Sequence, residues 1–141
     1  MKKNKNHESL VKTKQYFAVK KGINGLGLFA KLPINKKMKI LEYFGEIIPV
    51  AEADRRGGKY LFEISSRRTI DGKERRNIAR YVNHSCVPNC EAETDGSKVF
   101  IWSVKDILPG EELTYDYGKE YFDEYIKPKG CRCIKCSKKS K

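Results

Sequence analysis

The 141-residue chain lacks any apolar run approaching the ~20 residues needed to span a membrane. Its start, 1–6, is basic, but no apolar segment of about 7–15 residues follows, so we expect no secretory signal peptide. It also lacks an internal repeat and a low-complexity segment. We therefore expect an intracellular protein without membrane contact, cytoplasmic if its source is microbial. The length favours one compact domain.

Acidic residues are missing from the C-terminal end and scarce at the start. Residues 1–21 hold seven Lys and one Glu, and residues 127–141 hold seven Lys or Arg and no acid. The body, 22–126, holds 16 basic and 17 acidic residues, so the two ends account for the net charge of +12. Basic ends favour a polyanion such as nucleic acid as a partner, and solvated Lys-rich tails are the alternative.

Short apolar segments separated by glycine and proline turns predict a mainly β protein. We expect strands near 15–19, 28–30, 39–50, 60–64, 67–70, 98–104 and 112–117, and a turn at 22–27. Short helical pieces are expected at 51–56, 77–82 and 119–126. The last 15 residues have little apolar content of their own, and we expect them to form a loop.

The five cysteines are odd in number, and three lie within six residues: Cys131, Cys133 and Cys136. In a chain without a signal peptide this clustering indicates metal binding and not a disulfide framework. A tetrahedral zinc site needs four ligands and binds thiolates at about 2.3 Å. The fourth ligand would be Cys86 or Cys90, which would pin the polar tail to the domain. Free surface thiols and an iron–sulfur cluster are the alternatives.

Three further strings are each weak evidence of a site when taken alone. The glycines of 24–27 would let a ligand approach the backbone closely, but turns use glycine as often. A dinucleotide fingerprint would need a third glycine. His84, next to Asn83, could simply cap a turn, and the alternate tyrosines of 110–118 could simply pack on a strand.

Taken together and in order, these strings resemble the SET-domain protein lysine methyltransferases over most of the chain. The resemblance is carried by Gly25-Leu26-Gly27-Leu28-Phe29-Ala30, Tyr43-Phe44-Gly45-Glu46, Tyr60-Leu61-Phe62, Ile70-Asp71, Asn77-Ile78-Ala79-Arg80-Tyr81-Val82-Asn83-His84-Ser85-Cys86 and Glu111-Glu112-Leu113-Thr114-Tyr115-Asp116-Tyr117. The Asn-His-Ser-Cys-x-Pro-Asn and Glu-Leu-Thr-Tyr-Asp-Tyr strings are highly specific. The closing cysteines resemble the family's post-SET segment.

The resemblance implies a SET fold, with small curved β-sheets, short helices and a C-terminal pseudoknot-like threading. That threading would bring Asn83 and His84 beside 115–117. The implied organisation is a basic N-terminal tail at 1–14, a SET domain at 15–118 and a post-SET zinc-binding segment at 119–141.

The resemblance also implies that S-adenosylmethionine binds in a surface pocket and that the target lysine enters from the opposite face. The implied cofactor-binding residues are Asn24, Gly25, Leu26, Gly27, Tyr60, Arg80, Asn83 and His84. The implied catalytic residues lining the lysine channel are Tyr60, Tyr115 and Tyr117, with Tyr117 nearest the transferred methyl group. Burial in an aromatic channel disfavours the charged form of the lysine.

A tyrosine at 115 leaves little room for an already methylated lysine, so we expect mono- or dimethylation as the main outcome. The implied substrate is a basic protein, a histone or histone-like, which would place the enzyme in a nucleus or host nucleus. Six acids would favour a basic peptide, with a solvated helix and turn as the alternative: Glu111, Glu112, Asp116, Glu120, Asp123 and Glu124. A catalytically weak, zinc-stabilised module that binds chromatin or nucleic acid is the other interpretation of the chain.

The family's fourth zinc ligand is the cysteine of its Asn-His-Ser-Cys string, which selects Cys86 over Cys90. Only two residues separate Cys133 from Cys136, fewer than the family usually has, although this spacing still permits a tight chelate. The segment 46–60 is also shorter than in many members, which suggests a shallow substrate groove.

Overall fold

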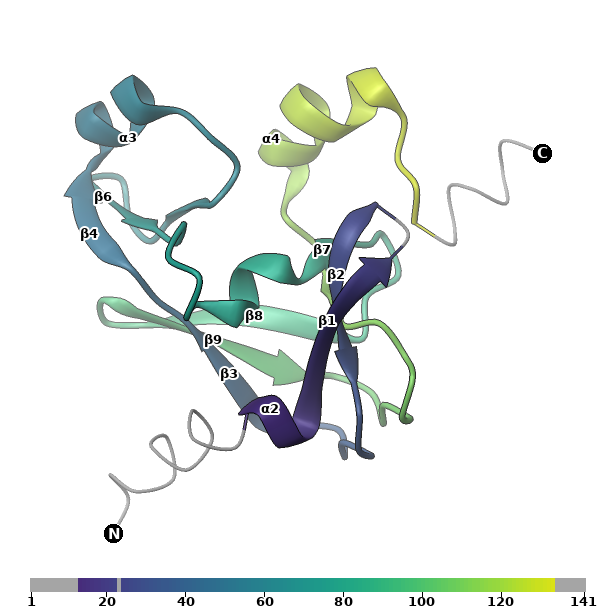
Figure 1. Ribbon diagram of the computed structural model, residues 1–141. Coiled ribbons are helices and arrows are strands. Elements are labelled where there is room, and N and C mark those ends of the chain that lie inside the picture. Colours follow the sequence, from purple (N-terminus) through teal and green to yellow (C-terminus); the bar gives the residue numbers. More distant parts are fainter. Residues whose placement is uncertain (1–12, 23, 134–141) are drawn as a thin grey trace, which may run out of the picture.

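The computed structural model describes residues 13–22 and 24–133, in which the strands form four small sheets (Figure 1). Cys136 and residues 1–12 of the predicted tail lie outside the described residues. The predicted mainly β architecture with short helices is confirmed. No helix in the described part of the chain is long and apolar enough to cross a membrane.

The first sheet is an antiparallel hairpin of β1 (Phe17–Gly22) and β2 (Gly25–Ala30), which follows the single turn α2 (Thr13–Tyr16). Gly25 has a φ of +74°, a left-handed conformation that favours glycine, and the chain reverses just before it. The predicted turn at 22–27 is therefore tighter than expected, because most of that segment is paired in the hairpin.

The second sheet has the order β3 (Lys39–Tyr43), β9 (Lys98–Ser103), β8 (Cys90–Asp95), and all its pairs are antiparallel. Its central strand supplies Val99 and Ile101 to the core, where both are fully buried. The edge strand β8 was not predicted. Only its first residue is buried, so its sequence has no apolar alternation to mark it as a strand.

The third sheet has the order β4 (Glu46–Pro49), β6 (Arg68–Asp71), β5 (Leu61–Glu63). The segment 39–50, predicted to form one or two strands, forms two, one in this sheet and one in the second. Gly45 marks the division, because a Cβ there would lie 2.0 Å from a carbonyl oxygen of β6. Only a glycine lets the backbones approach this closely.

The helix α3 (Val50–Arg56) is tied to the third sheet by its last residue. Arg56 donates from Nη1 to Glu46 at 3.0 Å and to Asp71 at 2.9 Å. Its Nε donates to Glu52 at 2.8 Å. The side chain of Asp71 is 6% exposed, and a buried carboxylate is tolerated when it is paired in this way.

The fourth sheet joins β7 (Asn83–His84) to β10 (Thr114–Tyr115) as a parallel pair. β7 directly follows the 3-10 helix η1 (Ile78–Tyr81). The predicted juxtaposition of the Asn-His pair with the tyrosine string is therefore confirmed. The strand predicted at 112–117 is limited to two residues.

The segment before β10 is bonded to the edge of the hairpin. Leu113 N donates to Leu28 O at 2.8 Å, and Ala30 N donates to Glu111 O at 3.0 Å. Leu28 and Leu113 are both fully buried in the core. These bonds attach the segment that leads into β10 to the hairpin.

The C-terminal described segment is helical over α4 (Lys119–Tyr121), η2 (Phe122–Ile126) and η3 (Lys127–Lys129). The helix predicted at 119–126 is confirmed and extends slightly further. In Figure 1 this segment lies at the same end of the molecule as α3.

Candidate functional site

Two cavities, of about 570 Å³ and about 590 Å³, share a largely aromatic wall. Both volumes lie in the range of small-molecule sites, about 300–1,000 Å³. Seven residues line both cavities: Lys59, Tyr60, Arg80, Tyr117, Tyr121, Glu124 and Tyr125. The two cavities therefore meet at this wall.

The first cavity gathers almost all the predicted cofactor-binding residues. Those that line it are Asn24, Gly25, Leu26, Tyr60, Arg80, Asn83 and His84. Gly27 is buried behind the cavity, where a Cβ would lie 2.2 Å from an oxygen of Glu112. The structure thus places Gly27 in a supporting position and the other seven at the cavity surface.

Asn83 is held in one orientation by two protein acceptors. Its Nδ2 donates to Leu26 O at 3.1 Å and to Glu112 Oε2 at 2.7 Å. Both amide protons are used in this way, and Oδ1 has no partner in the described part of the chain. Oδ1 is therefore the atom left to accept a hydrogen bond from a ligand. Gly27 makes room for the carboxylate that fixes it.

Arg80 stands beside two tyrosine rings, with its guanidinium carbon 4.8 Å from the ring centroid of Tyr60 and 4.7 Å from that of Tyr81. It donates to the Tyr81 hydroxyl at 2.6 Å and to the Lys73 carbonyl. Its Nε is buried and has no hydrogen-bond partner among the described residues. A buried donor without a partner is costly, so a bound molecule that accepts from it would be favoured.

Seven of the sixteen residues that line the second cavity are aromatic: Tyr43, Tyr60, Phe62, Tyr115, Tyr117, Tyr121 and Tyr125. The ring centroids of Tyr115 and Tyr117 are 4.9 Å apart, and those of Tyr117 and Tyr121 are 5.1 Å apart. Burial raises the pKa of Tyr43, Tyr115 and Tyr117 far above the usual tyrosine range. These phenols stay neutral, so the tyrosines contribute ring faces and hydroxyl groups to the wall and no negative charge.

Tyr117 lies where the two cavities meet, and three contacts fix it. Its hydroxyl donates to Val82 O at 2.5 Å, and its backbone N–H donates to Nδ1 of His84 at 3.0 Å. Its ring also contacts the His84 ring edge-on, at a centroid distance of 5.4 Å. All these partners belong to β7 or the residue before it, so the parallel pairing of β7 and β10 sets the position of Tyr117.

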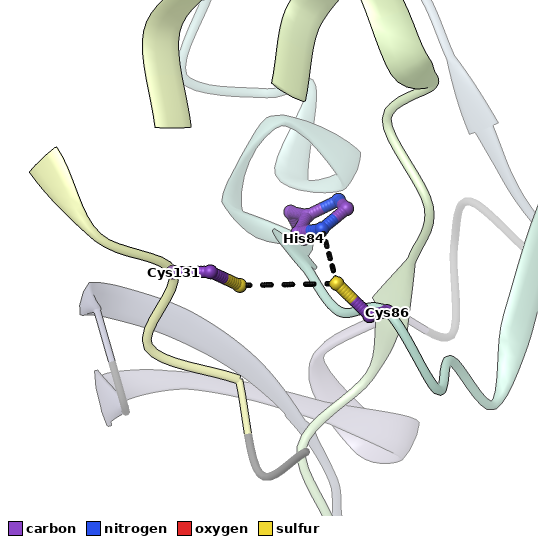
Figure 2. Close-up of side chains that lie close together, drawn as sticks. All are labelled: His84, Cys86 and Cys131. Atoms are coloured by element: carbon purple, nitrogen blue, oxygen red, sulfur yellow. Dashed lines mark hydrogen bonds between the residues drawn. The ribbon is translucent and has the colours of Figure 1, made fainter. Parts of the chain in front are cut away.

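His84, Cys86 and Cys131 form a cluster of candidate metal ligands next to the first cavity (Figure 2). The Sγ atoms of Cys86 and Cys131 are 4.0 Å apart. Two thiolates on one tetrahedral zinc ion lie about 3.8 Å apart, which follows from zinc–sulfur bonds of about 2.3 Å. The two cysteines come from segments 45 residues apart in sequence, and their geometry fits a shared zinc ion.

The imidazole of His84 is better placed to donate a hydrogen bond to Cys86 than to bind a metal. Its Nδ1 accepts from the backbone of Tyr117, so in the neutral ring the proton lies on Nε2, 3.5 Å from the Cys86 sulfur. Burial lowers the pKa of His84, and the nearby Asp116 carboxylate opposes this with a smaller effect. A nitrogen that carries a proton cannot bind a metal, and an N–H directed at a thiolate stabilises its charge.

The remaining three cysteines differ in their surroundings. Cys133 is buried and, like Cys131, lines the first cavity, while Cys136 lies outside the described residues. Cys90 packs in the hydrophobic core, where burial raises the pKa of its thiol to about 12. A thiol that resists losing its proton is a poor zinc ligand. The geometry therefore favours Cys86 over Cys90, as the resemblance implied.

Several wall residues were not predicted as site residues. Tyr121 and Tyr125 continue from Tyr117 at intervals of four, and the centroids of adjacent rings lie 5.1 and 4.9 Å apart. Because 119–126 was predicted to be helical, this spacing placed the tyrosines on one face and could have revealed them. Glu112 could not be found in this way, because its partner Asn83 is 29 residues away in sequence.

A family model described as SET domain matches residues 25–118. The histone-lysine N-methyltransferase, H3 lysine-4 specific, of Schizosaccharomyces pombe is 44% identical over 108 residues, 67% of this chain and 12% of that protein. Histone-lysine N-methyltransferase ATX2 of Arabidopsis thaliana is 37% identical over 128 residues, 81% of this chain and 12% of that protein. Histone-lysine N-methyltransferase 2D of Homo sapiens is 40% identical over 129 residues, 82% of this chain and 2% of that protein.

The chain therefore spans at most 12% of the length of these relatives. The matched family region contains the predicted glycines, the Asn-His pair and the tyrosine string. The chain belongs to the SET domain family, and its resemblance to SET-domain histone-lysine methyltransferases is confirmed.

Proposed function

We propose that the chain transfers methyl groups from S-adenosylmethionine to the side-chain amine of a lysine in a basic protein. One observation carries this proposal. The cavity that gathers the glycine turn and Asn83 meets the tyrosine-walled cavity at Tyr117. A methyl donor and an amine that entered from the two sides would meet there. The relatives named as histone-lysine N-methyltransferases support the same reaction.

The first cavity suits the methyl donor. S-adenosylmethionine carries a carboxylate, an ammonium group and an adenine ring, and when bound it supplies an electrophilic methyl group on a sulfonium. The unpaired Nε of Arg80 is a donor for an acceptor on the ligand, and Oδ1 of Asn83 is an acceptor for a donor. The cavity volume of about 570 Å³ is adequate for a molecule of this size.

The second cavity suits the lysine. The attacking amine must be neutral, because an ammonium group has no lone pair. Burial among Tyr60, Tyr115 and Tyr117 disfavours the charged form of the amine, and its proton passes to water. Since the tyrosines stay protonated, they orient the amine and do not remove its proton. Holding the amine in line with the methyl group supplies much of the rate enhancement.

The organisation proposed for the chain is a catalytic SET domain at 15–118 closed by a post-SET segment at 119–141. The described part of that segment supports this role, because ten of its residues between Tyr121 and Cys133 line the first cavity. The basic tail at 1–14 and any nucleic-acid contact through the Lys-rich ends stay predictions, because those ends lie mostly outside the described residues.

Zinc is the metal proposed for the cysteine cluster, with Cys86, Cys131, Cys133 and Cys136 as its ligands. The separation of 4.0 Å between two of the thiols and the N–H directed at Cys86 support it. A bound ion would hold the post-SET segment against the loop after β7, where that segment closes the first cavity. Because the segment has few apolar residues, metal binding would contribute directly to its folding.

The proposed substrate is a histone, because all three relatives above are named histone-lysine N-methyltransferases. Lysine 4 of histone H3 is the first site to test, because the name of the Schizosaccharomyces pombe relative specifies it. A histone substrate would place the enzyme in a nucleus. Four of the six predicted acids already bind within the domain: Glu111 to Leu108 N, Glu112 to Asn83, Asp116 to Gly118 N and Asp123 to Lys119. Of the six, Glu124 lines both cavities, and we propose that it attracts a basic peptide.

The reaction is tested by incubating the full chain with S-adenosylmethionine and an H3 tail peptide, followed by mass-spectrometric mapping. We expect methylation of lysine 4. Tyr117→Phe should lower the rate about 100-fold, the effect of misplacing a reacting group. A peptide with arginine in place of that lysine is the control. Donor binding without any transfer to this peptide or to whole histones would contradict the proposed reaction.

Mono- or dimethyllysine is the proposed product, because the Tyr115 ring is buried and its hydroxyl has no protein partner in the described part of the chain. That hydroxyl is available to the amine or to a water beside it, which leaves little room for a third methyl group. Tyr115→Phe should shift the product toward trimethyllysine. Tyr125→Phe, which changes the more exposed end of the wall, should leave the product distribution unchanged. Trimethylation by the wild type would contradict this proposal.

Glu124→Gln should raise the Michaelis constant for a basic peptide about two- to fivefold, the contribution of one exposed ion pair, and leave kcat unchanged. The difference should shrink as salt is added, because exposed charges are screened. Glu91→Gln is the matched control, since Glu91 is exposed on the edge strand β8 and lines neither cavity. Equal Michaelis constants for both variants would show that Glu124 does not attract the peptide.

The zinc proposal predicts about one equivalent of zinc in the purified chain, measured by elemental mass spectrometry. Cys86→Ser should lose most of the metal and melt at least several degrees lower, because the post-SET segment loses its attachment. Cys90→Ala should keep the zinc, although removing a core side chain lowers its own stability. Full zinc content in Cys86→Ser would remove Cys86 from the ligand set.

A further inference from the structure

One lysine of the chain lies where the two cavities meet. Lys59 lines both, whereas Lys119 lines only the second and Lys129 only the first. Among the lysines that the structure describes, Lys59 alone shares this position with Tyr117. Lys59 therefore lies at the entrance of the proposed lysine channel, where a methyl-accepting amine would enter.

The backbone holds Lys59 beside the channel. The next residue, Tyr60, lines both cavities, and its carbonyl accepts hydrogen bonds of 2.7 Å from the Tyr43 hydroxyl and from a backbone N–H. The preceding residues, Gly57 and Gly58, both have positive φ, which turns the chain back from α3 toward the site. In Figure 1 the loop that follows α3 extends toward α4.

The side chain of Lys59 is exposed and weakly held. Its Nζ lies 5.3 Å from the centroid of the Tyr60 ring, and it has no carboxylate partner among the described residues. Lys119 differs, because it is paired with Asp123 at 2.8 Å. A flexible four-carbon stem can therefore carry the Lys59 amine into the channel without breaking an ion pair.

We propose that Lys59 enters the channel of its own molecule and is methylated there. This inference rests on the proposed function. The Lys59 amine first loses a proton to water, and its lone pair then forms a bond to the methyl carbon. The bond from that carbon to sulfur breaks, its electron pair stays on sulfur, and the sulfonium becomes a thioether. Before methylation, the same lysine competes with the protein substrate for the channel.

The test incubates the full chain with S-adenosylmethionine that carries a deuterated methyl group, with no peptide present. We expect label on Lys59 in tandem mass spectra, at a rate per molecule that does not change with protein concentration. Lys59→Arg should lose the label. Lys98→Arg should keep it, because Lys98 is exposed on β9 and lines neither cavity.

A parallel sample with the H3 peptide separates this inference from the proposed function. Peptide methylation without label on Lys59 would overturn the inference and leave the function intact. A rate per molecule that rises with protein concentration would show transfer between molecules and would also overturn it. Absence of label on Lys59, together with no transfer to the peptide or to whole histones, would overturn both the inference and the proposed function.

Peptide binding gives a readout that needs no turnover. If Lys59 occupies the channel about half of the time, the channel binds a peptide about twofold more weakly than an unoccupied channel would. Lys59→Met should therefore bind the H3 peptide more tightly than the wild type in calorimetry with S-adenosylhomocysteine present, and Lys98→Met should not. Equal affinity of Lys59→Met and wild type would show that Lys59 does not occupy the channel.

Discussion

The rest of the site depends on the parallel pairing of β7 with β10. Two short strands, separated by 29 residues of intervening chain, are held side by side. Closing so long a loop costs entropy, and the burial of Leu113 and Val82 beside the pair offsets it. Once the pair forms, Asn83 meets Glu112 and His84 meets Tyr117. Neither contact could arise from local sequence alone.

His84 connects the proposed metal site to the proposed methyl-transfer site. One ring nitrogen accepts the backbone N–H of Tyr117, and the other donates to Cys86. A metal at the cysteines and a methyl acceptor at the tyrosine would therefore be linked through one imidazole. The proposed post-SET segment contributes to both sites, because it carries Cys131 as well as Tyr121 and Tyr125. A metal that held this segment in place would therefore also complete the walls of the cavities.

The sequence was informative where a function is carried by a specific string. Tyr117, Asn83 and Cys86 were predicted as site residues because their strings occur in order with the glycines of β2. In the structure Tyr117 and Asn83 line one cavity, and Cys86 lies 3.5 Å from His84, which lines it too. It was uninformative where a role depends on distant contacts. Glu112 was predicted only as one of six acids that favour a basic peptide. Its hydrogen bond from Asn83 distinguishes it from the other five. β8 was missed because a solvent-facing edge strand needs no apolar alternation.

The central claim is that the cavity bounded by the glycine turn, Arg80 and Asn83 accepts the methyl donor. Calorimetric titration of zinc-loaded protein with S-adenosylmethionine tests this most directly. The account predicts saturable binding at one site per chain, weakened when Asn83 is replaced by alanine. An absence of binding heat at several temperatures, with no displacement of a labelled donor, would contradict it.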